Sequence, residues 1–116
     1  MHSKLALILT AALLAVFVQS QAADQLDVVY KTTEEGPLKL DLHYPAVPKA
    51  GTMFPLVLFT HGGGWVTGTK TIGDRGVRFM GVKALNAQGF CVASVDYRLC
   101  KKEGDITVRD CVTDVK

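Results

Sequence analysis

The sequence lacks the residue clusters that bind metals or nucleic acids. Only three of its 116 residues are cysteine. There is no CxxC pair and no grouping of cysteine with histidine, so a zinc site is not supported. Basic and acidic residues are nearly balanced, at 13 and 11, and the basic ones form no stripe. We therefore expect no metal, no cofactor and no nucleic-acid partner.

The chain also lacks an apolar run long enough to span a membrane. After His2 and Lys4, the run 5–18 is apolar except for Thr10, but it is shorter than the ~20 residues of a spanning helix. A basic start, an apolar middle and a small-residue site are the pattern of a signal peptide. We expect a signal peptide over 1–22 with cleavage after Ala22, and a secreted or periplasmic protein without a stable membrane anchor. An uncleaved anchor and a buried terminal helix are the alternatives.

All the cysteines lie in the part that would remain after cleavage, residues 23–116. In an oxidising compartment, Cys100 and Cys111 would be able to close a loop with ten residues between them. Alternatively, all three are small buried residues, because spacing alone does not determine pairing. Both interpretations remain open.

Two segments after the predicted cleavage site have the composition of β-strands. Residues 26–33 are rich in β-branched and aromatic side chains, and residues 34–37 supply the glycine and proline of a turn. From Leu38 to Tyr44, apolar residues alternate with polar ones, which is the pattern of a strand with one solvated face. His43 would lie on that solvated face. The two segments together predict a β-hairpin.

Two short apolar segments predict the buried strands of a parallel sheet. Residues 55–60 and 90–95 show no polar alternation, which is typical of strands covered on both faces. Between them, apolar residues recur at helical spacing from Val77 to Ala87, and Gly89 can close the helix in a left-handed conformation. Strand, helix and strand form a βαβ unit with parallel strands. The predicted fold class is therefore α/β.

A second helix is predicted at the carboxyl end, beginning near Asp105 or Thr107. Its apolar face would consist of Val108, Cys111, Val112 and Val115, which recur at helical spacing. No cap, glycine or proline ends this pattern, so we expect the helix to continue through Lys116.

The most informative stretch is residues 61–70, HGGGWVTGTK, directly after the predicted strand 55–60. Consecutive glycines allow backbone conformations closed to other residues, and outward-turned N–H groups can bind an anion or a developing oxyanion. A phosphate-binding GxxxxGK[ST] loop would need a glycine where Thr69 stands, and GxGxxG would need one where Thr67 stands. Nucleotide binding is therefore disfavoured, while a plain connecting turn remains an alternative.

The glycine loop carries a resemblance to a known family. HGGGW at 61–65, followed through a helix by VDYRL at 95–99, resembles the α/β-hydrolase carboxylesterases, in particular the hormone-sensitive-lipase-like and bacterial feruloyl-esterase-type groups. The resemblance implies that the N–H groups of Gly63 and Gly64 form the oxyanion hole. It also implies that His61 braces the loop without being the catalytic base, and that Trp65 helps to wall the pocket.

The same resemblance implies supporting roles near the carboxyl end. Asp96 and Arg98 would hold the loop after the fourth predicted strand through hydrogen bonds and an ion pair, with ordinary strand-end roles as the alternative. Residues 110–116 resemble part of the helix that precedes the nucleophile strand. The family implies a sheet of about eight strands, of which four are recognisable here.

The catalytic triad of such an esterase cannot be assembled from this sequence. The mechanism requires a serine in a GxSxG elbow, then an acid and a histidine base. Ser3 and Ser20 lie in the predicted signal peptide, and Ser94 lies inside a predicted strand without elbow glycines. We therefore expect the nucleophile, acid and base to lie outside this chain. The chain would be the inactive amino-terminal fragment of an α/β-hydrolase domain, truncated before the nucleophile elbow.

Two functions from different classes remain open. The first is an exported serine hydrolase that cleaves carboxylic esters through an acyl-serine, with acetyl or feruloyl esters of carbohydrates as candidate substrates. The second is a non-catalytic relative of the fold that serves as a binding module or pseudoenzyme. In the first case, the partner is a small-molecule or carbohydrate ester.

Overall fold

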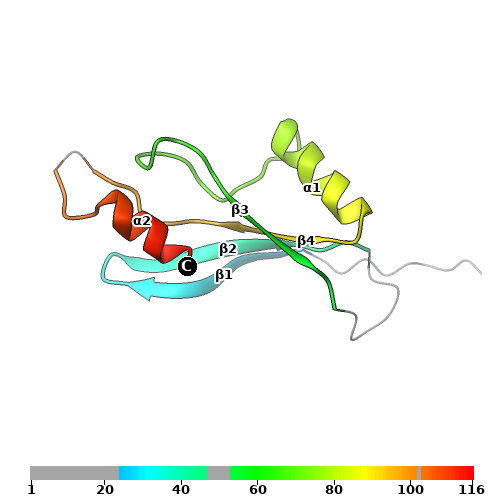
Figure 1. Cartoon of the computed structure of the whole chain (residues 1–116), viewed down its shortest axis with the longest axis horizontal. Coiled ribbons are helices and arrows are strands. Elements are labelled where there is room, and N and C mark those ends of the chain that lie inside the picture. Colours follow the sequence, from blue (N-terminus) through cyan, green and yellow to red (C-terminus); the bar gives the residue numbers. More distant parts are fainter. Residues whose placement is uncertain (1–23, 47–52, 102) are drawn as a thin grey trace, which may run out of the picture.

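The computed structural model describes residues 24–46, 53–101 and 103–116. The predicted signal peptide and its cleavage site lie outside the described residues. The described strands form a four-stranded sheet in the order β1-β2-β4-β3, with a helix at each end of the strands (Figure 1). Within these ranges, no helix is long and apolar enough to cross a bilayer.

The first two strands form the predicted β-hairpin. Strand β1 spans Gln25–Thr33 and strand β2 spans Gly36–His43, and the two pair antiparallel around a short turn. Strand β2 also pairs antiparallel with β4. The hairpin is therefore continuous with the rest of the sheet.

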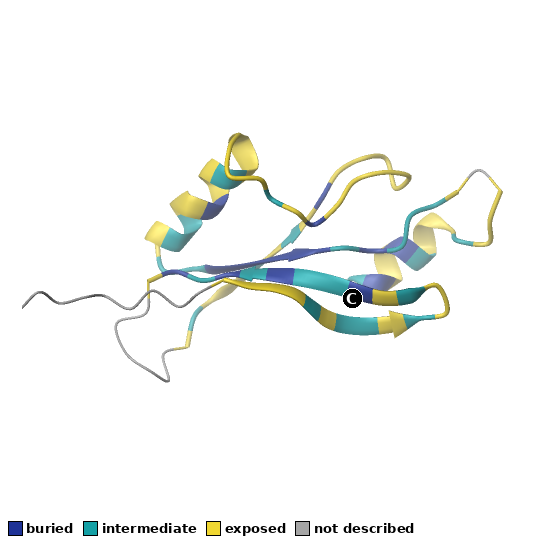
Figure 2. Cartoon of the chain, turned by 180° about the vertical axis from the view of Figure 1, so that it is seen from behind, coloured by how far each residue is buried: buried dark blue, intermediate teal, exposed yellow. Residues whose placement is uncertain are grey.

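The predicted βαβ unit is present. Strand β3 (Leu56–Thr60), helix α1 (Val77–Ala87) and strand β4 (Cys91–Val95) follow one another, and β3 pairs parallel with β4. Gly89 takes a φ of 87° and donates its N–H to Asn86 at 2.9 Å, which closes α1 as expected. Strand β4 is buried along its whole length, and Figure 2 shows it as the buried centre of the sheet.

Strand β3 differs from the prediction that it is covered on both faces. Leu56 and Leu58 are 61% and 50% exposed, whereas Val57 and Phe59 are half-buried. The side chains of a strand alternate between faces, and only the face that carries Val57 and Phe59 lies against α1. Leu56 and Leu58 point to the opposite face, which the described residues leave exposed.

The buried face of α1 also differs from the prediction. Val77 and Met80 are 87% and 69% exposed, while Val82 is the buried residue of the helix. The Asn86 side-chain amide donates to the carbonyl oxygens of His43 (3.0 Å) and Phe90 (2.8 Å). These two hydrogen bonds fix the rotation of α1, so that Val82 packs against the sheet while Val77 and Met80 remain exposed.

Two polar residues of strand β2 are buried, contrary to the prediction that they lie on a solvated face. Asp41 and His43 are only 4% and 8% exposed. Each has a polar partner: the Lys70 ammonium group lies 2.7 Å from Asp41, and the Asp24 carboxylate lies within hydrogen-bond distance of Nδ1 of His43, at 2.8 Å. Burial of polar groups requires such partners, and alternation along one strand cannot reveal them.

Helix α2 spans Val108–Asp114 and begins where predicted, at the N-cap Thr107. A capping box forms, in which Thr107 and Asp110 exchange side-chain to backbone hydrogen bonds. The helix ends at Asp114, two residues before the position that the apolar spacing predicts. Cys111 and Asp114 are its buried residues, whereas Val108 and Val112 are 47% and 38% exposed.

Candidate functional site

A cleft of about 450 Å³ lies where β3 ends and α2 approaches it. This volume falls in the usual range of small-molecule sites. On one side the cleft is lined by the glycine loop, and on the other by the carboxyl end of α2. The lining residues are Thr60, His61, Gly62, Gly64, Trp65, Tyr97, Val112, Val115 and Lys116.

Positive φ values and one close backbone contact shape the glycine loop. Gly63 and Gly64 have φ values of 127° and 60°, and the Gly63 carbonyl accepts the N–H groups of Val66 at 3.2 Å and Thr67 at 3.3 Å. A β-carbon added to Gly63 would lie 1.9 Å from the Thr67 carbonyl oxygen. Trp65 follows with a φ of 69°. The chain thus turns back tightly after β3, as the repeated glycines indicate.

The N–H groups of Gly63 and Gly64 donate no hydrogen bond to any described residue. Both residues are exposed, and only Gly64 contributes to the lining of the cleft. Unpaired amides in a glycine turn are suited to bind an anion or an oxyanion. The sequence predicts this role for both residues, and Gly64 is the one that borders the cleft.

His61 and Trp65 are held by Tyr97. The His61 ring stacks on Tyr97 with a centroid distance of 4.3 Å and an interplanar angle of 11°. The Tyr97 hydroxyl donates to the His61 carbonyl at 2.8 Å, and Trp65 packs tilted on the same ring at 5.4 Å. His61 is only 4% exposed, and its Nδ1 lies 2.9 Å from the Gly62 carbonyl. His61 is therefore positioned to support the loop, and its imidazole ring is shielded from solvent.

Asp96 and Arg98 hold the segment after β4, as the resemblance implies. The Asp96 carboxylate accepts the Lys70 backbone N–H at 2.6 Å. The Arg98 guanidinium binds both oxygens of Asp114, with contacts of 2.9 to 3.2 Å. Burial alone would raise the pKa of Asp114, but the hydrogen bonds from Arg98 lower it. This ion pair fixes α2 against the end of β4.

Lys70 is a structural residue that the sequence does not identify. Its ammonium group donates to Asp41 at 2.7 Å and lies 2.9 Å from Asp27, and its carbonyl accepts the Ser94 hydroxyl at 2.6 Å. Burial by itself would lower the pKa of Lys70, but the hydrogen bonds to Asp41 and Asp27 raise it. Lys70 thus anchors the end of the glycine loop to the hairpin and to β4. Asp41 is 29 positions away in the sequence, and no local pattern pairs the two.

The position of Ser94 does not allow it to act as a nucleophile. The residue is fully buried in β4, and its hydroxyl is engaged with the Lys70 carbonyl. In the described ranges, no group of three or more His, Cys, Asp or Glu side chains lies together as a metal-ligand set.

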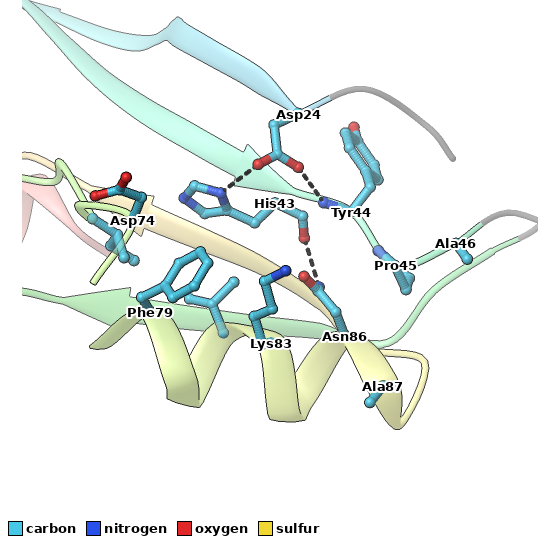
Figure 3. Close-up of a pocket in the computed structure, with 12 residues that line it drawn as sticks. Asp24, His43, Tyr44, Pro45, Ala46, Asp74, Phe79, Lys83, Asn86 and Ala87 are labelled. Atoms are coloured by element: carbon cyan, nitrogen blue, oxygen red, sulfur yellow. Dashed lines mark hydrogen bonds and ion pairs between the residues drawn. The ribbon is translucent and has the colours of Figure 1, made fainter. Parts of the chain in front are cut away.

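A second cleft, of about 520 Å³, lies at the other end of the strands (Figure 3). Asp24, His43 and Asn86 line it together with Lys83. Figure 3 shows the Asp24 carboxylate bound to both the His43 ring and the Tyr44 N–H. The cleft is larger than the one at the glycine loop, but none of the residues in the HGGGW or VDYRL segments lines it. We therefore place the candidate site at the glycine loop.

Solved structures identify the fold. Esterase 2 of Thermogutta terrifontis phosphorylated by paraoxon superposes with a TM-score of 0.63 and 26% sequence identity, covering 78% of this chain and 32% of that chain. The apo form of the same esterase gives a TM-score of 0.61 at 26% identity, covering 83% of this chain and 32% of that one. The four strands and two helices are thus part of an α/β-hydrolase fold of the esterase class.

The sequence comparisons identify the family. Residues 40–116 match the BD-FAE family, so the chain belongs to the BD-FAE family of α/β-hydrolase esterases. The non-reducing polyketide synthase Preu6 of Preussia isomera is 38% identical over 73 residues, which cover 63% of this chain and 3% of the synthase. The synthase ausA of Penicillium brasilianum is 36% identical over 83 residues, covering 71% of this chain and 3% of that protein. The chain therefore corresponds to a small part of these synthases.

Proposed function

We propose that the protein containing this chain is a carboxylic-ester hydrolase in which the HGGGW loop stabilises the oxyanion. The mechanism would proceed through an acyl-serine, with the serine, acid and histidine supplied by residues outside this chain. Gly64, with Gly63 beside it, would donate backbone hydrogen bonds to the oxyanion that forms when the serine attacks the ester carbonyl. His61 and Trp65 would keep the loop and the pocket wall in position.

The observation that carries this proposal is the N–H of Gly64, which lies at the edge of a cleft and donates no hydrogen bond to any described residue. Gly64 is exposed and takes a φ of 60°, a conformation that glycine adopts at little steric cost. The stacked His61 and Tyr97 rings and the Lys70 anchor fix both ends of the loop. Such rigidity is what an oxyanion site requires, because its donors act by being preorganised.

For the substrate, we propose small-molecule or carbohydrate esters, with acetyl and feruloyl esters as the first candidates. The cleft volume of about 450 Å³ accommodates an acyl group of modest size. Trp65 is 38% exposed and presents an aromatic wall on which an aromatic acyl group would pack. A comparison of methyl ferulate with p-nitrophenyl acetate distinguishes aromatic from acetyl preference.

We also propose that the protein is exported after removal of residues 1–22. The support is the order of a basic start, an apolar run and small residues in the sequence. Amino-terminal sequencing of the protein from its native host tests this directly. A mature chain that begins at Ala23 is expected, and a retained Met1 would overturn the assignment.

The test of the enzymatic function uses the complete protein. We expect hydrolysis of p-nitrophenyl acetate and covalent phosphorylation by paraoxon, as the related Thermogutta esterase undergoes. Peptide mass spectrometry should place the phosphoryl group on a serine within a GxSxG segment. A folded protein that neither hydrolyses esters nor becomes phosphorylated would refute the proposal and favour the binding module.

A further inference from the structure

The two cysteines near the carboxyl end lie side by side. The Cys100 and Cys111 sulfur atoms are 3.6 Å apart, although the residues belong to different segments, the loop after β4 and helix α2. A disulfide bond is about 2.05 Å long, so bond formation requires the sulfurs to approach by roughly 1.5 Å. Cys91, the third cysteine, is buried inside β4 and has no such neighbour among the described residues.

We propose that Cys100 and Cys111 form an intramolecular disulfide that clamps the loop after β4 onto α2. The same two segments are already joined by the ion pair between Arg98 and Asp114. The existing ion pair holds the two thiols at short range, so the bond forms without a change in the path of the chain. Cys100 lies outside the regular helices and strands, so the approach of the sulfurs breaks no helix or sheet hydrogen bond of that residue.

The surroundings of the two thiols assign them different roles in bond formation. Cys100 is partly exposed, whereas Cys111 is fully buried and donates its S–H to the Thr107 carbonyl at 3.3 Å. The pKa of Cys111 is raised to about 11, mainly by burial and to a smaller extent by the hydrogen bond with Cys100. Cys100 is therefore the thiol that an external oxidant reaches first, and Cys111 is the one that resolves the intermediate.

The oxidant is a small-molecule or protein disulfide, for which oxidised glutathione serves as the probe. The Cys100 thiolate attacks one glutathione sulfur and expels the first glutathione thiolate, which leaves a mixed disulfide. Cys111 loses its proton to solvent and attacks the Cys100 sulfur, which expels the second glutathione thiolate. The two expelled thiolates take up the two protons lost by the cysteines. Overall, two cysteine thiols lose two electrons and one oxidised glutathione becomes two thiols.

The disulfide would also restrain the glycine loop, because Cys100 is hydrogen-bonded to a residue of that loop. The Cys100 N–H donates to the Trp65 carbonyl at 2.8 Å, so fixing Cys100 also restrains the residue that follows the three glycines. The clamp concerns the fold of this chain and does not depend on ester hydrolysis.

The experiment incubates the native full-length protein with oxidised glutathione, then denatures it, alkylates the free thiols and digests it with trypsin. Cleavage after Arg98, Lys101, Arg109 and Lys116 separates the cysteines. We expect peptide 99–101 linked to peptide 110–116, with Cys91 alkylated. Alkylation of both Cys100 and Cys111, a link to Cys91, or glutathione retained on Cys100 would each overturn the proposal.

Variants provide the matched comparison. Cys91→Ala should keep the cross-link, whereas Cys100→Ser should abolish it. In the wild type and in Cys91→Ala, oxidation should raise the melting temperature by roughly 5 to 15 °C, because the bond constrains the unfolded chain. Cys100→Ser should show no shift on oxidation. An equal shift in Cys100→Ser would show that the stabilisation does not arise from this bond.

Discussion

Replacement of Lys70 by methionine tests the ionic centre that joins the hairpin to the glycine loop. The Asp41 side chain is 6% exposed, so removal of the lysine leaves a buried carboxylate without its cation. Loss of one partner of a buried ion pair costs about 3 to 5 kcal/mol. Asp41 keeps a hydrogen bond from the Asp27 N–H at 2.9 Å. We therefore expect the free energy of unfolding to fall by about 3 kcal/mol, the lower end of that range.

The assay is urea unfolding of the complete protein, followed by circular dichroism. Lys70→Met should lower the midpoint at an unchanged slope. The double variant Lys70→Met, Asp41→Leu should recover most of the loss, because it removes the stranded charge. Lys39→Met, on the same strand as Asp41, is the matched control and should change stability by less than about 0.5 kcal/mol. A loss below about 1 kcal/mol in Lys70→Met, or no recovery in the double variant, would refute the reasoning.

Three further predictions concern the loop and α2. Gly63→Ala places a β-carbon 1.9 Å from a backbone oxygen, so ester hydrolysis should fall about 100-fold through displacement of the loop, while Gly73→Ala, with open space around it, should keep normal kcat/KM. Thr107→Ala removes the capping box and should lower the free energy of unfolding in urea by about 1 kcal/mol. Thr113→Ala, at an exposed position in the last turn of the helix, should cost less; equal losses would contradict the capping role. The pKa of Asp114 is lowered from 3.8, so its contribution to stability is present above pH 3.8 and is lost as the pH falls below it. Urea midpoints measured from pH 6 to pH 3 should therefore drop at the acidic end, and Asp114→Asn should flatten that drop.

The order of elements was predictable because each depends on local sequence. Gly89 ends α1 as expected, since a left-handed residue is needed there. Thr107 caps α2 because a hydroxyl side chain satisfies free N–H groups at a helix start. The hairpin and the parallel pair follow from alternation in one segment and continuous apolar character in two others.

The orientation of faces was not predictable, because it depends on contacts between distant residues. Alternation in β2 suggested that Asp41 and His43 face solvent, but the Lys70 ammonium group lies 2.7 Å from Asp41 and the Asp24 carboxylate lies 2.8 Å from the His43 ring. Similarly, Val77 and Met80 of α1 are exposed because the side-chain amide of Asn86 fixes the rotation of the helix by donating a hydrogen bond to the His43 carbonyl. A sequence pattern records which residues share a face, but not which face is buried.

Part of the site was predictable for the same reason. The glycine loop follows from consecutive glycines after a strand, and Gly63 and Gly64 do adopt positive φ values. The contribution of Tyr97, which holds both His61 and Trp65, depends on the pairing of β3 with β4 and has no local signal.

The most direct test of the central claim replaces the Gly64 amide with an ester, so that the N–H becomes an oxygen and the side chain is unchanged. A proline would be less informative, because it cannot adopt the φ of 60°. In the complete protein, we predict that kcat for p-nitrophenyl acetate falls about 100- to 1000-fold while KM changes little. The same replacement at Gly73, outside the cleft, should leave kcat unchanged. An unchanged kcat in the Gly64 ester would contradict the assignment of this loop as the oxyanion hole.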